Sequence, residues 1–244
     1  MSASFAAAYR QLAAAQKGHA RGAPGYSVYV NRRVGRMLAA FAFRVGITPN
    51  QATAISAVHT FTGLALLLLL PAAWWTGILV ALLLALGYAW DSADGQIARL
   101  RGGGSLAGEW LDHFVDALKI ASLHLVVLLA LQLHTPLDGT PWLLIPLAFS
   151  VVDVVTFFGM LLNDLLKQKK GVQSTHSRGG GTFLRSMILL PTDFGLLCLV
   201  FALWGWTTGF LAVYAVLALI NALFLALAAV KWFREISALD REDG

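Results

Sequence analysis

Apolar residues fill most of the chain in long runs that are separated by short polar or turn-forming stretches. A helix that crosses the hydrocarbon core of a membrane needs about 20 mostly apolar residues. Six runs meet this requirement, near residues 50–71, 74–98, 107–131, 141–165, 183–204 and 208–232. The pattern therefore predicts an all-α integral membrane protein with six transmembrane helices.

The residues before the first run have a different pattern. Alanine, leucine and aromatic residues are mixed with Arg and Lys there, which is typical of amphipathic helices that lie on a membrane surface. We therefore expect an interfacial, amphipathic segment at 1–48, a six-helix domain at 49–235 and a cytoplasmic tail at 236–244. A flexible tail explains the first twenty residues equally well.

Basic residues lie on one side of the predicted spans. Seven of them precede the first span, and others follow the second, fourth and sixth. The three connections on the opposite side contain no Lys or Arg, and Trp residues mark that side. Because Lys and Arg near the ends of spans collect in the cytoplasm, both termini are predicted to be cytoplasmic.

The composition supports the same class of protein. Hydrophobic residues make up 58% of the chain and charged residues 13%, which excludes an ordinary soluble domain. We expect membrane lipid, and no nucleic acid, among its partners. The single cysteine, Cys198, falls in the fifth predicted span and is interpreted as a packing residue.

Four aspartates interrupt the apolar pattern. Asp91 and Asp94 end the second predicted span, and Asp112 and Asp116 lie in the third. Residues three or four apart share one face of a helix. Because a glycine turn folds the two helices back on each other, the four carboxylates are predicted to converge at the cytoplasmic side of the membrane.

Four carboxylates so close together indicate a metal-binding site. They repel one another unless cations neutralise them or some are protonated. Oxygen ligands favour Mg²⁺ or Mn²⁺, and four aspartates can hold two ions, an arrangement that recurs in phosphoryl transfer. The alternative is a structural network of paired charges in a transporter or scaffold. The adjoining small residues and Arg99 favour the metal interpretation.

Small residues surround the aspartates. Gly95, Ala98 and Gly108 leave little side chain between the helices, so a nucleotide or phosphate could approach the backbone closely. Arg99 offers a hydrogen-bond donor to a phosphate or to an aspartate. The residues therefore predict a phosphate-bearing ligand beside the metal.

The same stretch also resembles a known signature. It reads D-x2-D-G-x2-A-R-x8-G-x3-D-x3-D, which is similar to the complete motif of the CDP-alcohol phosphotransferase family. All eight fixed residues match: Asp91, Asp94, Gly95, Ala98, Arg99, Gly108, Asp112 and Asp116. The six-helix layout and the ITPNQAT stretch at 47–53 extend the likeness over most of the chain.

The resemblance implies an enzyme in which a hydroxyl attacks the β-phosphorus of a CDP-activated alcohol and CMP leaves. It implies that the four aspartates bind two metal ions and that Asp116 is also the catalytic base. The CDP-binding residues that it implies are Thr48, Asn50, Thr53, Asp91, Asp94, Gly95, Ala98, Arg99 and Gly108. It further implies a homodimer in the cell membrane, with a polar cavity open to the cytoplasm.

Two branches of the family differ in their substrates. One transfers a phosphatidyl group from CDP-diacylglycerol to a polar alcohol, and the other transfers a choline- or ethanolamine-type headgroup to diacylglycerol. Glu109 and His113 resemble the second branch. The short chain and its basic N-terminal segment suit the first, which we favour. The loop run SRGGGTFLR departs from the inositol-phosphate enzymes, so inositol phosphate is in doubt as the acceptor.

Several polar residues are candidates for acceptor binding. They are Glu109, His113, Lys119, Arg178 and Arg185. Arg178 and Arg185 are explained equally well as anchors on the positively charged side of the membrane. Asp153 and Asp193 either bond to helix backbones or line the pocket, whereas His124 is expected to be a buried polar contact between helices.

Overall fold

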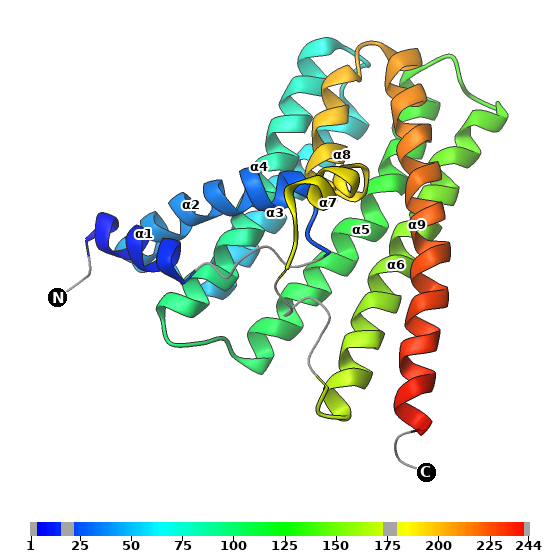
Figure 1. Cartoon of the computed structure of the whole chain (residues 1–244). Coiled ribbons are helices and arrows are strands. Elements are labelled where there is room, and N and C mark those ends of the chain that lie inside the picture. The colour runs from blue at the N-terminus through cyan, green and yellow to red at the C-terminus, as the bar shows by residue number, and fades with distance from the viewer. Residues whose placement is uncertain (1–3, 16–21, 173–179, 242–244) are drawn as a thin grey trace.

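The computed structural model describes residues 4–15, 22–172 and 180–241, whose regular structure is entirely helical. Figure 1 shows a bundle of long helices with α1 and α2 lying to one side of it. The long helices are α3 (Pro49–Leu69), α4 (Trp74–Leu100), α5 (Leu106–His134), α6 (Leu144–Lys169) and α9 (Thr207–Arg241). The shorter ones are α1 (Phe5–Ala14), α2 (Arg32–Val45), α7 (Phe183–Ile188) and α8 (Phe194–Val200).

Five helices in the described part of the chain are long and apolar enough to cross a membrane. They are α3, α4, α5, α9 and α6, the last together with the preceding turn η2 (Pro141–Leu143). Each matches one of the predicted spans, and α9 continues past the predicted end to Arg241. The predicted all-α membrane architecture is confirmed.

The predicted span at 183–204 is not one helix. It contains α7, the turn η4 (Leu190–Thr192), α8 and the turn η5 (Phe201–Leu203). Pro191 lacks the N–H that a continuous helix needs, and the Asp193 carboxylate accepts from the backbone N–H groups of Gly195 (3.0 Å) and Ser27 (2.7 Å). Asp193 therefore bonds to helix backbones. Because the remaining apolar helix is too short to span a membrane alone, the count of six spans stays a prediction.

An aromatic core fills the end of the bundle where α4 and α9 begin. Its fully buried rings are Phe149, Phe201, Trp204, Phe210 and Tyr214. They meet at centroid distances of 5.0–5.6 Å, in edge-on, tilted and stacked pairs that suit the charge distribution of aromatic rings. This packing holds α6, η5 and α9 together.

A buried histidine ties this core to two neighbouring helices. His124 of α5 is 1% exposed, and its ring nitrogens contact the Tyr214 hydroxyl and the Asp153 carboxylate, the latter at 2.9 Å. Its ring also stacks on Phe149 at 4.2 Å. The expectation of a buried interhelical contact is confirmed, and Asp153 is its partner rather than a residue of the polar pocket described below.

The helix α2 packs on α4 through small residues. A Cβ atom at Gly35 would lie 2.8 Å from Oγ of Ser92, so the two backbones approach closely there. Met37, Phe41 and Val45 lie exposed on another face of α2. This amphipathic pattern supports the predicted membrane-surface position, which stays a prediction.

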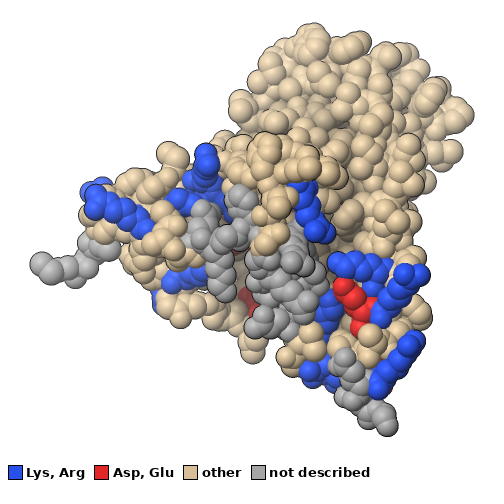
Figure 2. All heavy atoms as spheres, viewed as in Figure 1, with Lys and Arg blue, Asp and Glu red and all other residues tan. Residues whose placement is uncertain are grey.

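Charged residues are unevenly distributed over the surface. On the face drawn in Figure 2, Lys and Arg gather over α1, α2 and the lower ends of α6 and α9. The upper part of the bundle, where α4 and α9 begin, shows none on that face. The distribution agrees with the predicted cytoplasmic orientation, which stays a prediction.

Candidate functional site

The site lies where α3 begins and where α4 turns into α5. Thr48 caps α3 in a reciprocal capping box with Gln51, with bonds of 3.2 and 2.9 Å. Gly102 and Gly103 have φ values of +95° and +137°, which side-chain-bearing residues rarely adopt. Ser105 then caps α5 by accepting from the N–H of Gly108 at 3.1 Å. The caps and the glycine turn fix where α3 and α5 begin, and the packing of α3 along α4 brings both starts next to the end of α4.

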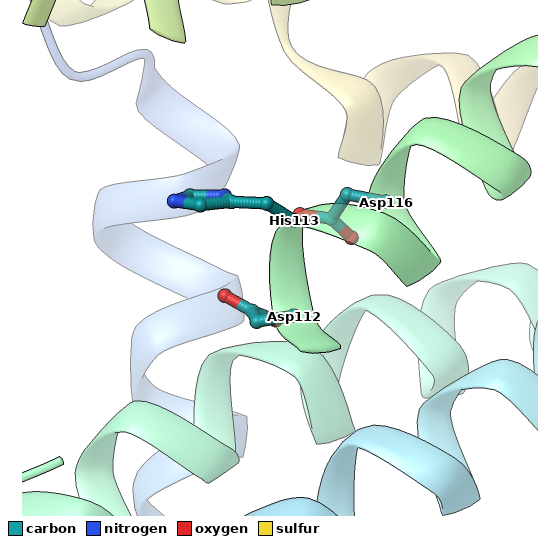
Figure 3. A group of neighbouring side chains, drawn as sticks. All are labelled: Asp112, His113 and Asp116. Atoms are coloured by element: carbon teal, nitrogen blue, oxygen red, sulfur yellow. The ribbon is translucent and has the colours of Figure 1, made fainter. Parts of the chain in front are cut away.

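The four aspartates converge as the spacing predicts; together they are called the aspartate cluster (Asp91, Asp94, Asp112 and Asp116). Carboxylate oxygens of Asp91, Asp94 and Asp112 lie within 4.8 Å of one another. Asp112 and Asp116 form a second such group with His113, and Figure 3 shows all three side chains on α5. The structure therefore offers two overlapping sets of ligand atoms, one shared by α4 and α5 and the other on α5 alone.

The aspartates have unequal partners. Asp94 accepts a 2.7 Å hydrogen bond from the Thr53 hydroxyl. Asp91 and Asp116 both contact the ammonium group of Lys119, at 3.0 Å for Asp116. Asp112 differs, because its Oδ1 is buried and has no hydrogen-bond partner among the described residues.

A divalent cation fits this arrangement. A buried carboxylate oxygen without a partner is costly, and a cation beside it would remove that cost. Asp91, Asp94 and Asp112 together offer the all-oxygen ligand set that Mg²⁺ and Mn²⁺ prefer. The residues that would hold the ion are thus in place.

A polar cavity of about 920 Å³ opens beside the cluster. Seven residues predicted to bind CDP line it: Thr48, Asn50, Thr53, Asp94, Gly95, Ala98 and Gly108. Asp112, Glu109 and His113 line it as well. A Cβ atom at Gly108 would lie 3.2 Å from the side chains of Asn50 and Ser105, so glycine there keeps this wall open. The cavity is large enough for a nucleotide.

Two of the predicted CDP-binding residues do not line the polar cavity. Asp91 lies in a neighbouring cavity of about 140 Å³ with Asp116 and Lys119, which is called the lysine cavity. Arg99 lies near Gly95, with Nη1 3.7 Å from the position of a Cβ atom there. The arginine that does line the polar cavity is Arg101.

Sequence reasoning assigned Arg101 only to the basic side of the membrane. Its guanidinium donates to the backbone carbonyls of Gly46 (3.1 Å) and Ile47 (3.0 Å), next to Thr48. It also lies 5.9 Å from the Phe43 ring centroid. The only signal in the sequence was its place at the glycine turn.

An apolar groove of about 610 Å³ lies between α5 and α6. It is lined by aromatic and aliphatic side chains, including Trp110, Phe114, Phe157 and Phe158. Leu106, Glu109 and His113 line both this groove and the polar cavity. The two spaces therefore adjoin at these three residues.

The remaining acceptor candidates that the structure describes, Lys119 and Arg185, lie apart from the polar cavity. Arg178 lies outside the described residues. Arg185 is exposed on α7 and does not line the polar cavity. Lys119 is buried against the aspartates. Of the predicted acceptor residues within the described part of the chain, only Glu109 and His113 line the polar cavity.

Comparisons with known proteins agree with this geometry. Residues 46–233 match the family model described as CDP-alcohol phosphatidyltransferase. A comparison with curated proteins finds no match. Among solved structures, the chain is similar to the crystal structure of Mycobacterium tuberculosis phosphatidylinositol phosphate synthase in complex with manganese and citrate. The TM-score is 0.57 and the identity 20%, over 80% of this chain and 87% of the other.

The two findings carry different information. At 20% identity, the structural likeness shows a shared fold. The family model covers well over half of the chain and includes both aspartate pairs and the residues around the polar cavity. The protein therefore belongs to the CDP-alcohol phosphatidyltransferase family, whose members are transferases of phospholipid synthesis.

Proposed function

We propose that the protein transfers a phosphatidyl group from CDP-diacylglycerol to the hydroxyl of a small polar alcohol and releases CMP. Membership in the family supports the reaction class. The observation that carries the proposal is the polar cavity, whose wall combines glycines, an arginine and two members of the aspartate cluster. This combination suits a nucleoside diphosphate next to a divalent cation.

The proposed reaction needs residues that bind the cation, accept a proton and hold the CDP moiety. A bound Mg²⁺ or Mn²⁺ would supply positive charge to the diphosphate oxygens. Asp91, Asp94 and Asp112 would hold the cation, and Asp116 would accept the proton of the attacking hydroxyl. Gly95, Ala98 and Gly108, with Thr48, Asn50 and Thr53, would hold the CDP moiety, because they line the polar cavity.

The apolar groove supports a lipid substrate. An acyl chain could lie between α5 and α6 while the attached phosphate reaches the polar cavity past Glu109 and His113. A soluble alcohol would enter from the basic side of the membrane. We also propose that this side is cytoplasmic, since Lys and Arg near membrane spans collect there, and that the protein is a homodimer, as the family resemblance implies.

One observation favours a second candidate. Glu109 and His113 stand where the polar cavity meets the apolar groove, so they could contact the hydroxyl of a lipid acceptor. The enzyme would then transfer a headgroup from a CDP-linked alcohol to diacylglycerol. A transporter or scaffold, in contrast, would not need a nucleotide-sized cavity beside the aspartates.

The test is CMP release by the purified protein with Mg²⁺. One set of reactions contains CDP-diacylglycerol and a panel of polar alcohols. The other contains CDP-choline, CDP-ethanolamine or CDP-glycerol with diacylglycerol. We expect release in the first set only. Release in the second set alone would reverse donor and acceptor, and metal or proton flux without CMP would contradict the transferase proposal.

The variants Glu109→Gln and His113→Asn give a matched control for the second candidate. Glu109→Gln removes an acidic group and His113→Asn removes a basic one, and both keep the side-chain size close to the original. If the acceptor is a lipid, they lower turnover in the second set of reactions. If the acceptor is a soluble alcohol, their effect appears in the KM for that alcohol.

A further inference from the structure

The polar cavity has two walls that are far apart in the sequence. One wall is the start of α3, from Thr48 to Thr53, and the other runs from Asp94 through the glycine turn to His113. A ligand that contacts both walls at once binds well only if their spacing is fixed before it arrives. Contacts that join the two walls therefore influence how tightly the cavity can hold a nucleotide.

Side-chain hydrogen bonds join the walls at both ends of the polar cavity. At the aspartate end, the Thr53 hydroxyl donates to Asp94 at 2.7 Å. At the turn end, Nη2 of Arg101 donates to the backbone carbonyls of Gly46 (3.1 Å) and Ile47 (3.0 Å), which come directly before the α3 wall. Unlike Asp94, Arg101 is not one of the eight motif residues.

The two carbonyls are a favourable target for a cation. Gly46 ends α2 with a φ of +87°, and carbonyl groups at the C-terminus of a helix carry partial negative charge. Nη2 of a guanidinium has two N–H groups, so it can donate to two oxygens at once. The guanidinium of Arg101 also lies 5.9 Å from the Phe43 ring centroid. Arg101 therefore contacts the end of α2 as well as the residue that leads into α3.

The backbone of Arg101 is fixed on the other wall. Its N–H donates to the carbonyls of Ile97 and Ala98, both at 3.1 Å. The N–H of Gly103 donates to the same Ala98 carbonyl at 2.9 Å, and Ala98 and Gly103 both line the polar cavity. The side chain of Arg101 thus extends from a well-bonded point at the end of α4 to the residues before α3.

The nucleoside of the donor would lie beside this contact. In the proposed function, the phosphates lie next to the aspartate cluster and the lipid leaves past Glu109 and His113. The part of the cavity that remains for the nucleoside is lined by Thr48, Asn50 and the glycine turn. A Cβ atom at Gly108 would lie 3.2 Å from Oδ1 of Asn50, so there is little spare space between α3 and α5. A small shift of α3 would therefore change the fit of a nucleoside.

We propose that Arg101 is a positioning residue, which holds the start of α3 at the distance from the glycine turn that the nucleoside of the donor needs. The inference rests on the proposed function and adds to it a residue outside the motif. Within the described part of the chain, the side-chain hydrogen bonds of Arg101 go to backbone carbonyls and not to the aspartates. Loss of Arg101 should therefore weaken nucleotide binding and leave the chemical step unchanged.

The first test needs no nucleotide. Hydrogen exchange of the full chain in detergent is followed by mass spectrometry in the unchanged protein and in Arg101→Met, which removes the N–H groups and the charge. We expect the amides of residues 46–53 to exchange about tenfold faster in the variant, because this segment loses its bonds to the turn, while α9 exchanges as before. Unchanged exchange at 46–53 would overturn the proposal.

Arg33→Met is the matched control. It removes the same charge from an exposed position on α2 that does not line the polar cavity. Exchange at 46–53 should stay as in the unchanged protein. If Arg33→Met accelerates this exchange as much as Arg101→Met does, the effect comes from lost charge and not from the bonds to Gly46 and Ile47, and the proposal fails.

The second test measures the dissociation constants of CMP and of cytidine in the presence of Mg²⁺, with cytidine as a competitor of radiolabelled CMP. We expect Arg101→Met to raise both constants by the same factor, about tenfold, the scale of one lost hydrogen bond to a charged group. Arg33→Met should bind both as before. Because cytidine has no phosphate, a loss confined to CMP would mean that Arg101 pairs with the phosphate itself, which contradicts a positioning role.

Turnover separates positioning from catalysis. In Arg101→Met the KM for the CDP-alcohol should rise about tenfold, with kcat within about twofold of normal. Arg101→Lys keeps an ammonium with three donors, which can bond to both carbonyls, so it should recover most of the loss. A fall in kcat at unchanged KM would assign Arg101 to the chemical step and overturn the proposal.

The inference and the proposed function can fail separately. If exchange at 46–53 responds as expected but the unchanged protein neither binds nor releases CMP, the proposed function fails, and Arg101 still holds the two walls together. If the unchanged protein releases CMP while Arg101→Met keeps normal exchange and a normal KM, the proposed function stands and the role of Arg101 fails.

Discussion

Small residues have opposite roles at the two ends of the bundle. In the aromatic core, a Cβ atom at Gly77 of α4 would overlap the carbonyl oxygen of Phe201 and lie 2.8 Å from Cβ of Trp204. Eighteen residues further along α4, or about five helical turns, a Cβ atom at Gly95 near the aspartates would meet only Nη1 of Arg99, at 3.7 Å. Gly77 lets α4 pack directly against the backbone of Phe201, whereas Gly95 leaves space beside the aspartates.

The polar groups differ between the two ends in the same way. In the core, His124 has a partner on each ring nitrogen. In the aspartate cluster, Asp112 has a buried oxygen without a partner among the described residues. Satisfied polar groups and tight packing stabilise a fold, and unsatisfied charge next to a cavity is typical of a binding site. We infer that the end of the bundle with the aromatic core contributes most to the stability of the fold, and that the end with the aspartate cluster carries out the reaction.

The largest expected effect is that of Asp112→Asn. The change removes a charge from both groups of ligand atoms, so we expect kcat/KM for CMP release to fall about 1,000-fold, the scale of losing a group that stabilises transition-state charge. Because the carboxylates repel one another, the melting temperature should stay the same or rise. Activity above about a tenth of normal would contradict the assignment.

The next effect is expected at the other end, from Gly77→Ala. The added methyl group overlaps backbone atoms of Phe201, so α4 and η5 must separate. Overpacking of this kind costs about 3 kcal/mol. Thermal unfolding in detergent should show a clear fall in melting temperature. An unchanged melting temperature would mean that the core is less tightly packed than its geometry indicates.

Tyr214→Phe removes one partner of His124 without changing the shape of the core. A buried ring nitrogen then lacks a hydrogen bond, which costs about 1–3 kcal/mol. Activity of the protein that remains folded should stay near normal, since Tyr214 belongs to the aromatic core and does not line the polar cavity. Loss of turnover at unchanged stability would instead connect this network to the reaction.

Gly95→Ala is the matched counterpart of Gly77→Ala and has the smallest expected effect on the fold. A Cβ atom has room there, and alanine favours a helix over glycine by up to about 1 kcal/mol, so stability should be unchanged or slightly higher. The methyl group narrows the polar cavity, and we expect the KM for the CDP-alcohol to rise about tenfold, or about 1.4 kcal/mol. This KM is measured from the rate of CMP release at a series of CDP-alcohol concentrations.

The sequence was sufficient for features that depend on neighbours along the chain. Span length follows from apolar runs, and five predicted spans are helices of the structure. The aspartate cluster follows from three- and four-residue spacing on two helices joined by a glycine turn. Thr48 and Ser105 cap helices, a role that depends on neighbours along the chain and that their residue types favour.

Features that depend on contacts between distant segments needed the tertiary structure. Apolar composition predicted one span at 183–204, but Asp193 bonds to Ser27, which is 166 positions away. The motif in the sequence singled out Arg99, yet Arg101 lines the polar cavity and Arg99 does not. The sequence also did not determine that Asp91 and Asp116 pair with Lys119. Nor did it determine that Asp112 has a buried oxygen without a partner among the described residues. Helix periodicity sets the face on which a side chain lies, whereas its partners depend on how separate helices pack, and no local pattern encodes that packing.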